Sequence, residues 1–276
     1  MQPCQQHSVN FGRKSKMFDY HMHTYVSFDG HDSPEQVIQA ALKAGLKEVC
    51  FTDHVDDDPK GIDNNKFTIE AYNAAYDGLE APGLKIRRGL EFGMLAGNQE
   101  LLRWYLQQRH FDFVLGSVHY VDNWDAYYPE YWEGKTQEQA ERRYMEDTLT
   151  CVKAHDDFDV LGHLTYISKS KCHPNPRPLP YDEHREIIDE ILRCLAAKGK
   201  GMEMNTSGVD RCGGFLPTAD IFRRFKELGG EIVTVGSDAH NCSRVGQYTF
   251  DACRILQDIF GYVCTFEDRK PIFHKL

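Results

Sequence analysis

Short strand-like runs alternate with amphipathic helical runs along nearly the whole chain, and this alternation constrains the fold more than any other feature. Apolar residues that recur every three to four positions predict helices, and short apolar runs bounded by turn residues predict strands. The predicted strands cover residues 17–21, 47–54, 84–93, 111–119, 158–163, 199–205 and 231–240. The predicted helices lie within residues 33–45, 68–79, 98–109, 135–155, 181–198, 217–228 and 243–260. Repeated strand–helix units predict an α/β fold in which helices cover a parallel sheet, either open or closed.

The length of 276 residues suits one domain, and no shift in composition marks a domain boundary. We interpret residues 1–16 as a polar N-terminal extension and residues 17–276 as a single domain. Two long connections, 120–134 and 164–180, are typical of lids or binding loops. Residues 262–266 predict a short additional strand.

Charge and apolar content exclude several classes of protein. The formal net charge is −10, which argues against a broad basic face for extended nucleic acid. No apolar run of about eighteen residues occurs, so no membrane span is predicted, and the N-terminus lacks the apolar region of a secretory signal. The nine cysteines are odd in number, scattered and without a CxxC pair. We therefore expect reduced thiols and a cytoplasmic location.

Histidines and carboxylates recur at or near the ends of the predicted strands. They are His21, His23, His54, Glu91, His119, His163, Asp238 and His240. In a parallel β/α barrel the carboxyl ends of all strands open on one face, where active sites are built. Imidazole and carboxylate ligands together suit zinc, manganese or iron. The pattern therefore predicts a site for divalent metal ions.

A simpler interpretation exists for each residue alone, because a single histidine at a strand end is more often structural than a ligand. The joint occurrence at six strand ends argues against that interpretation for the set. We interpret the remaining histidines as surface residues, namely His7, His31, His110, His155, His173, His184 and His274. Asp56, Asp57 and Asp58 are expected to be solvated loop charges. Asp53, next to His54, is expected to orient a neighbouring ligand.

Six short motifs, in this order, resemble those of the polymerase and histidinol phosphatase (PHP) superfamily. They are HMHTYVSFDG, FTDH, GLEFG, GSVH, GHL and GSDAH. The resemblance runs from about Met17 to about Val263, and the six motifs taken together are highly specific for this superfamily. The single-domain length and the segment EMNTSG at 203–208 are most similar to stand-alone histidinol-phosphatases of that superfamily. The resemblance implies a distorted (β/α)₇ barrel with two or three divalent ions.

Carried over position by position, the resemblance implies three metal sites. The first set is His21, His23, Glu91 and Asp238, the second is Glu91, His119 and His163, and the third is Asp29, His54 and His240. Asp29 stands where some relatives carry histidine. This difference keeps a metal ligand at the position but replaces a nitrogen donor by an oxygen donor, which makes the third site chemically harder. Glu91, Asp238 and His240 are the implied catalytic residues. Three ions, three carboxylates and a hydroxide leave about two positive charges, which suits a phosphate monoester.

The resemblance thus implies a metal-dependent phosphomonoesterase, with L-histidinol phosphate as the expected substrate and a hydroxide between two ions as the attacking group. A small phosphorylated metabolite is the expected partner, and the sequence does not indicate an oligomeric state. Candidate phosphate-binding residues are Arg211, Arg244, Ser207 and Lys169. The loop at 120–134 offers acidic and aromatic groups for the amine and the imidazole.

Three alternatives remain open on the sequence. One is a PHP phosphodiesterase or exonuclease, since the negative net charge disfavours long nucleic acid but not nucleotides. A second is a protein-tyrosine phosphatase. The third is a non-enzymatic, metal-stabilised regulatory barrel, which the complete ligand set disfavours.

Overall fold

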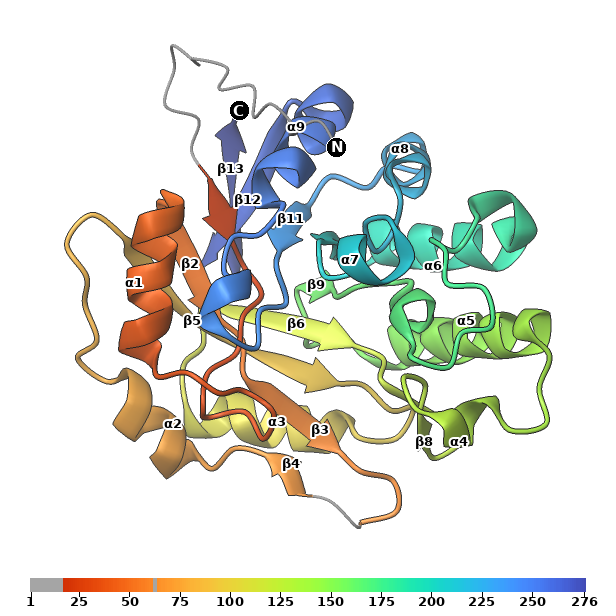
Figure 1. Cartoon of the computed structure of the whole chain (residues 1–276), viewed down its shortest axis with the longest axis horizontal. Helices are drawn as coiled ribbons and strands as arrows, with labels where there is room; N and C mark the ends of the chain where they lie inside the picture. Colours follow the sequence, from red (N-terminus) through yellow and green to blue (C-terminus); the bar gives the residue numbers. More distant parts are fainter. Residues whose placement is uncertain (1–16, 62–63) are drawn as a thin grey trace, which may run out of the picture.

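A computed structural model describes residues 17–61 and 64–276, so the predicted extension at 1–16 lies outside the described residues (Figure 1). Seven parallel strands pair in the order β1-β2-β5-β6-β9-β10-β11. Their bounds are β1 Phe18–Asp19, β2 Glu48–Phe51, β5 Lys85–Gly93, β6 Phe113–Ser117, β9 Val160–Leu161, β10 Gly201–Asn205 and β11 Val233–Gly236. Every one of the predicted parallel strands is present, although β1 and β9 are shorter than expected.

Hydrogen bonds between β11 and the chain that follows β1 close the sheet into a barrel. Tyr20 N donates to Val235 O at 2.9 Å, and Asp238 N donates to His21 O at 2.8 Å. A parallel bridge between Met22 and Ala239 lies just beyond. The predicted distorted (β/α)₇ barrel is thereby confirmed.

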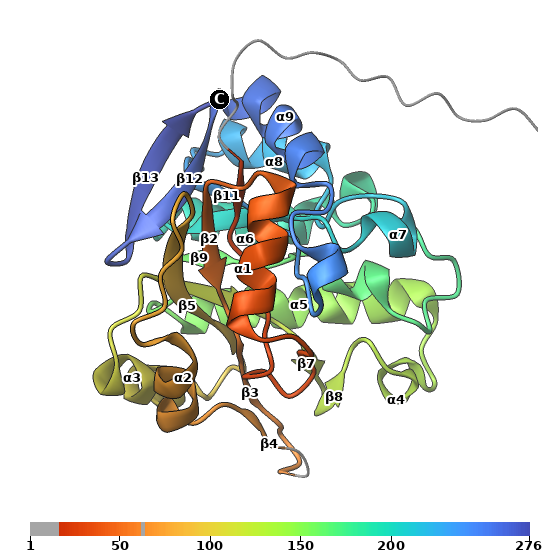
Figure 2. The same ribbon diagram turned by 60° about the vertical axis from the view of Figure 1, so that its left-hand side comes forward.

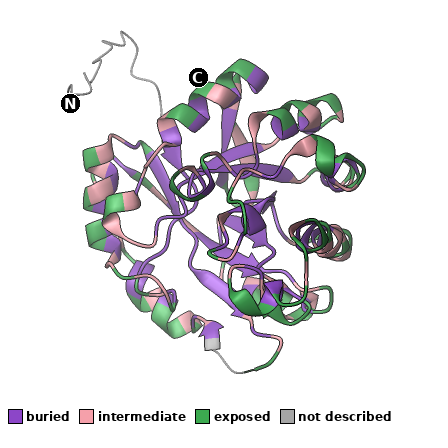
Figure 3. Cartoon of the chain, turned by 45° about the vertical axis from the view of Figure 1, so that its right-hand side comes forward, coloured by how far each residue is buried: buried purple, intermediate pink, exposed green. Residues whose placement is uncertain are grey.

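Helices surround this barrel and place their polar faces in solvent (Figures 1 and 3). The long ones are α1 Pro34–Ala44, α2 Ile69–Tyr76, α3 Gln99–Gln108, α5 Gln137–Ala154, α6 Arg185–Ala197, α8 Ala219–Glu227 and α9 Thr249–Phe260. The shorter ones are α4 Pro129–Trp132, α7 Val209–Cys212 and the 3₁₀ turns η1 Tyr166–Lys169, η2 Tyr181–Glu183 and η3 Cys242–Arg244. Ser33 caps α1 by accepting from Gln36 N, and Gly45 ends it with a φ of 79°. No helix among the described residues is both long and apolar enough to cross a membrane.

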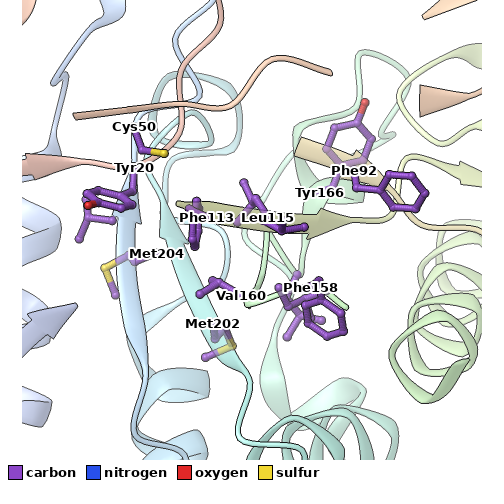
Figure 4. Close-up of a cluster of buried hydrophobic side chains, with 14 of the residues drawn as sticks. Tyr20, Cys50, Phe92, Phe113, Leu115, Phe158, Val160, Tyr166, Met202 and Met204 are labelled. Carbon is purple, nitrogen blue, oxygen red and sulfur yellow. The ribbon is translucent and has the colours of Figure 1, made fainter. Parts of the chain in front are cut away.

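Apolar side chains from neighbouring strands pack into a continuous core (Figure 4). Phe113 and Leu115 of β6, Val160 of β9 and Met202 and Met204 of β10 are all fully buried. Tight packing of this kind makes a scaffold with little freedom to relax, so the strand ends are held in fixed positions.

One predicted strand is in fact two. The prediction of a strand over 47–54 is wrong at its end, because β2 stops at Phe51 and β3 (His54–Asp57) begins a separate strand. β3 pairs in parallel with the second half of β5, so that His54 lies beside Glu91. It also pairs in antiparallel fashion with β4 (Asn64–Lys66). The long connection at 120–134 likewise contains a small hairpin, β7 (Tyr120–Val121) and β8 (Trp124–Asp125), followed by α4.

The end of the chain forms an antiparallel hairpin, of which only the first strand was predicted. β12 (Tyr262–Glu267) pairs with β13 (Lys270–Lys275), side by side in Figure 2. The turn residues Asp268 and Arg269 have φ values of 50° and 63°, which is typical of a two-residue hairpin turn. The helix predicted over 243–260 starts only at Thr249, because η3 and Gly246, with a φ of 71°, occupy the first positions.

Candidate metal centre

Eight of the predicted site residues converge at the carboxyl ends of the barrel strands. They are His21 and His23 after β1, His54 at the start of β3, Glu91 in β5, His119 after β6, His163 after β9, and Asp238 and His240 after β11. Asp29, in the connection between β1 and α1, joins them. Residues far apart in sequence therefore meet in one place, as the parallel topology predicts.

The first cluster consists of His21, His23, Glu91 and Asp238. His21 Nε2 lies 3.1 Å from Glu91 Oε2 and 3.5 Å from Asp238 Oδ1. His23 Nε2 lies 3.5 Å from Glu91 Oε2 and 3.4 Å from Asp238 Oδ1. Donor atoms on one tetrahedral zinc ion, at bond lengths of 2.0–2.1 Å, lie about 3.3 Å apart. The spacing of these four atoms fits that arrangement.

The second cluster uses the other oxygen of Glu91. Glu91 Oε1 lies 3.3 Å from His119 Nε2 and 3.0 Å from His163 Nε2, and the two nitrogens are 3.4 Å apart. Glu91 is fully buried between the two clusters. A carboxylate that offers one oxygen to each of two sets of imidazoles has the geometry of a bridging ligand.

A third cluster lies nearer to solvent. His240 Nε2 is 3.1 Å from Asp29 Oδ2, and His54 Nε2 is 3.8 Å from Asp29 Oδ1. The side chains of Asp29 and His240 are 37% and 28% exposed, whereas those of His21 and Glu91 are completely buried. This cluster is looser and more accessible than the other two.

Several polar atoms at the centre are buried without a hydrogen-bond partner among the described residues. They are His21 Nε2, His23 Nε2, Asp29 Oδ1, His54 Nδ1, Glu91 Oε2 and His163 Nδ1. Buried polar atoms are normally satisfied, and leaving one unpaired costs about 1–3 kcal/mol. All of these atoms except His163 Nδ1 point into the clusters. Divalent ions bound there would supply the missing partners, so the residues present fit such ions.

A second layer of carboxylates orients the imidazoles. Glu203 Oε1 lies 2.7 Å from His21 Nδ1, and its Oε2 accepts from His163 N at 2.8 Å. Asp56 Oδ2 lies 3.0 Å from His119 Nδ1. A histidine that donates Nδ1–H to a carboxylate presents an unprotonated Nε2 on the opposite side, which is the form that binds a metal. His21 and His119 are both held in this way.

Asp53 contacts Ser27, which in turn contacts His23, so Asp53 orients that histidine indirectly. Ser27 Oγ donates to Asp53 Oδ1 at 2.9 Å and lies 3.1 Å from His23 Nδ1. The Ser27 hydroxyl has a single proton, so His23 Nδ1 is the donor in the second contact. His23 Nε2 is thereby left unprotonated towards Glu91 and Asp238.

Two expectations about other polar residues were wrong. Asp56 and Asp58 are buried rather than solvated, because β3 carries Asp56 along the side of the barrel and Asp58 directly follows that strand. Three of the histidines assigned to the surface are also buried, namely His155, His173 and His184. His155 Nε2 bonds Leu95 O at 2.8 Å, and the other two contact Glu141 of α5. Glu203 was missed altogether, and its only signal was a charged residue inside the apolar run of β10.

The carboxylates of the two inner clusters stay ionised. Burial would raise the pKa of Glu91, but His21, His54 and His119 hold it well below its usual range. Burial would likewise raise the pKa of Asp238, but Lys169 and His21 lower it well below its usual value. For Asp29 too, burial opposes the effect of His54 and His240, which lower its pKa. The three carboxylates are therefore ionised, which is the form that binds cations.

A cavity of about 920 Å³ opens beside the clusters. Lys169, Ser207, Arg211 and Arg244, the candidate phosphate-binding residues, all line it. Lys169 Nζ pairs with Asp238 Oδ2 and lies 3.1 Å from Ser207 Oγ. Arg244 is paired with Asp210 at 2.5 Å, whereas Arg211 makes no ion pair within the described residues. Arg211 is thus the guanidinium best placed to take a new anionic partner.

Comparisons with known proteins agree with this geometry. Residues 19–207 match the family described as PHP domain. A histidinol-phosphatase from Lactococcus lactis is 32% identical over 233 residues, covering 83% of this chain and 86% of that protein. A protein named "probable histidinol-phosphatase" from Clostridium acetobutylicum is 29% identical over 260 residues, covering 93% of this chain and 96% of its own length.

Among solved structures, the histidinol phosphate phosphatase from Lactococcus lactis in complex with zinc, L-histidinol and phosphate is similar over almost its entire length. Its TM-score is 0.79 at 28% identity, covering 93% of this chain and 99% of that one. The family match runs from β1 to just beyond β10, which is more than half of the chain and includes most of the clustered residues. On this evidence the chain belongs to the PHP domain family.

Proposed function

We propose that the protein is a metal-dependent phosphomonoesterase that hydrolyses L-histidinol phosphate. One observation carries the proposal: Glu91 offers its two oxygens to two separate imidazole clusters, with donor spacings of 3.0–3.5 Å. This is the arrangement of a two-metal phosphatase site. Support for the substrate comes from the 28% identical Lactococcus lactis enzyme, whose structure contains zinc, L-histidinol and phosphate.

The nine residues of the three clusters are the proposed ligands for two or three ions of zinc, manganese or iron. They are His21, His23, Asp29, His54, Glu91, His119, His163, Asp238 and His240. When bound, such ions supply a water of lowered pKa and neutralise charge on the phosphoryl group. Glu203 and Asp56 then keep His21 and His119 in the correct tautomer. Glu91, Asp238 and His240 remain the proposed catalytic residues.

The cationic and hydroxyl groups beside the clusters are the proposed phosphate site. Arg211 is available for a bidentate contact, and Lys169 is held at the edge of the first cluster by Asp238 and Ser207. A phosphate there would touch both the clusters and these donors, since all of them line one cavity. Arg244 contributes less in this scheme because Asp210 already neutralises it.

Two broader features belong to the proposal. Residues 17–276 are proposed to act as one catalytic domain, with residues 1–16 as an extension. A cytoplasmic location is proposed because the described residues contain eight free cysteines.

A substrate panel at controlled metal content tests the function. The protein is loaded with zinc, manganese or iron in turn, and phosphate release is measured from L-histidinol phosphate, AMP, a phosphotyrosine peptide, p-nitrophenyl phosphate and bis-p-nitrophenyl phosphate. We expect the highest kcat/KM for L-histidinol phosphate and almost none for the diester. A higher kcat/KM for AMP or for the peptide would contradict the substrate assignment. Efficient cleavage of the diester would contradict the reaction class.

A further inference from the structure

The cavity beside the clusters has two chemically different sides. Lys169, Arg211 and Arg244 carry positive charge on one side, next to the proposed phosphate site. Another part of the lining comes from the segment from β7 to α4, which contributes aromatic rings and carboxylates; Lys60 lies over the ring of Trp124, and Lys171 lies near the rings of Tyr127 and Tyr128. Its lining residues include Trp124, Asp125, Tyr127, Tyr128 and Glu130. A phosphate monoester with a cationic, flat organic group would match both sides at once.

Asp125 in β8 is the carboxylate whose charge is least compensated. Its Oδ1 accepts from Tyr127 N at 2.8 Å and from Tyr166 Oη at 3.2 Å. Its Oδ2 accepts no hydrogen bond from the described residues, and Asp125 forms no ion pair with them. Burial raises the pKa of Asp125, although the imidazole of His119 and the hydrogen bonds from Tyr127 and Tyr166 act in the opposite direction.

The neighbouring carboxylates are less suited to bind a ligand. Asp56 is already engaged, since both of its oxygens contact His119 Nδ1, and it also lies 3.4 Å from His54 Nδ1. Glu130 lies on α4 and is exposed, so water screens its charge. A partly buried carboxylate with one unoccupied oxygen holds a cation better than either of these.

Tyr166 connects Asp125 to the metal clusters. Its hydroxyl donates to Asp125, while its ring lies 5.1 Å from the ring of His119 and 5.0 Å from that of His163. The second cluster and Asp125 are therefore separated by about one tyrosine side chain. L-Histidinol phosphate carries an amine and an imidazole on the short carbon chain that bears its phosphate.

We propose that Asp125 pairs with a protonated nitrogen of the substrate and thereby selects cationic phosphate monoesters over uncharged ones. The proposal rests on the proposed function in placing the phosphate at the clusters. Asp125 is a specificity-determining residue in this scheme, and the charge it supplies acts on substrate binding, not on the cleavage of the phosphate ester.

The test compares Asp125→Asn with the wild type on one cationic and one uncharged substrate. We expect kcat/KM for L-histidinol phosphate to fall by about 10- to 100-fold, mainly through KM, because a charge-assisted hydrogen bond is lost. We expect kcat/KM for p-nitrophenyl phosphate to stay within about twofold. The matched control is Asp122→Asn, a carboxylate in the same loop that pairs with Arg143 at 2.9 Å and should leave both substrates unaffected.

Each remaining outcome has a defined meaning. An equal loss on both substrates, or no loss on either, would overturn the role of Asp125. If the wild type does not cleave L-histidinol phosphate, the proposed function fails, and O-phosphoethanolamine then replaces it as the cationic substrate. If Asp125→Asn does not fold, inhibition of the wild-type enzyme tests the proposal instead. L-Histidinol should inhibit more strongly than an uncharged analogue whose amine is acetylated and which lacks the imidazole. Equal inhibition by the two compounds would overturn the proposal.

Discussion

Glu91 is the residue on which both inner clusters depend, because its two oxygens face different sets of imidazoles. Glu91→Gln retains the shape but removes the charge and one oxygen. We expect a folded protein with lower metal content and with turnover reduced by orders of magnitude, measured by metal analysis and phosphate release. Glu100→Gln, an exposed position on α3, is the control. Full metal occupancy together with near-normal turnover would exclude the bridging role.

A change at Glu203 tests whether a residue that orients a histidine, without itself contacting the metal, affects metal binding. The carboxylate of Glu203 contacts His21 Nδ1 and accepts from the backbone N of His163. A Cβ at position 236 would collide with Glu203 Oε1 and with the Cβ of His21, which explains the glycine there. Glu203→Gln should weaken zinc binding by about 10- to 100-fold, since the partner of a ligating histidine has that influence. Competition with a chromophoric chelator measures the affinity. Unchanged zinc affinity in a folded variant would contradict the orienting role.

Arg211 and Arg244 offer a matched pair of guanidinium groups. Arg211→Ala should lower kcat/KM by a factor that corresponds to about 1.5–3 kcal/mol. Arg244→Ala should cost less, because Asp210 already binds that side chain. Arg223→Ala, exposed on α8, serves as the reference. If Arg211→Ala equals the reference on the best substrate, another group binds the phosphate.

At the scale of single residues, the sequence is informative where the signal is local. His21 and His23 stand one residue apart, and Asp238 and His240 end an apolar run, so the sequence alone identifies them. Glu203 is not identifiable in this way, and for Asp125 the sequence indicates only its loop, residues 120–134. Their significance comes from partners more than thirty residues away, and no spacing within β10 or β8 reveals those partners.

At the scale of elements, β3 shows why strand boundaries are difficult to predict. The run at 47–54 contains no Gly or Pro that would mark a break, yet the chain leaves β2 at Thr52 and Asp53. The break is fixed by contacts from another segment, since Thr24 N and Ser27 Oγ both donate to Asp53 Oδ1. These contacts depend on the folded β1–α1 connection, and local propensity contains no information about them.

The connection between β9 and α6 provides a prediction about pH. Glu141 of α5 contacts His173 and His184 at 3.0 and 3.2 Å and so attaches this proline-containing segment to the barrel. Burial opposes ionisation of Glu141, but bonds from His173 and His184 lower its pKa from 4.5 to about 2. The folded-state pKa lies below the unfolded one, so this stabilisation is complete above about pH 4.5 and is lost as the pH falls towards 2.

Urea unfolding of wild type and Glu141→Gln at pH 7 and pH 3.5 tests this assignment. The stability difference between the two proteins should shrink by about 1–2 kcal/mol at the lower pH. Metal loss in acid affects both proteins alike, because they share the same clusters. Glu138→Gln, exposed on the same helix, should show no such pH dependence. A difference that stays constant would mean that Glu141 titrates normally in the folded protein.

At the scale of the whole molecule, the parallel sheet and its outer helices were predictable because every strand–helix unit has its own pattern. Closure of the sheet into a barrel was implied only by the family resemblance, since it depends on hydrogen bonds made beyond the end of the two-residue β1. The final hairpin was only half predicted. β13 alternates weakly between apolar and charged residues, and it is stabilised by pairing with β12 rather than by its own burial.

Removal of the metal ions should lower the stability of the entire domain. An ion at about one hundred times its Kd adds about 2.7 kcal/mol, and each kcal/mol shifts Tm by about 2–4 °C for a domain of this size. We therefore expect EDTA to lower Tm by about 5–10 °C and added zinc to restore it, as measured by calorimetry. The shift should be smaller in Glu91→Gln. Equal Tm values with chelator and with zinc would show that the clusters bind no ion in the folded state.

The first cluster lies across the joint at which the barrel closes. His21 and His23 follow the first strand of the barrel, β1, and Asp238 follows its last strand, β11. A single ion bound to all three would connect segments that more than two hundred residues of chain separate, and closing so long a loop removes much freedom from the unfolded chain. Such an ion would be a reversible cross-link between the two ends of the domain. Cells that limit the supply of that metal would then regulate how long the protein survives proteolysis, in addition to how fast it turns over substrate.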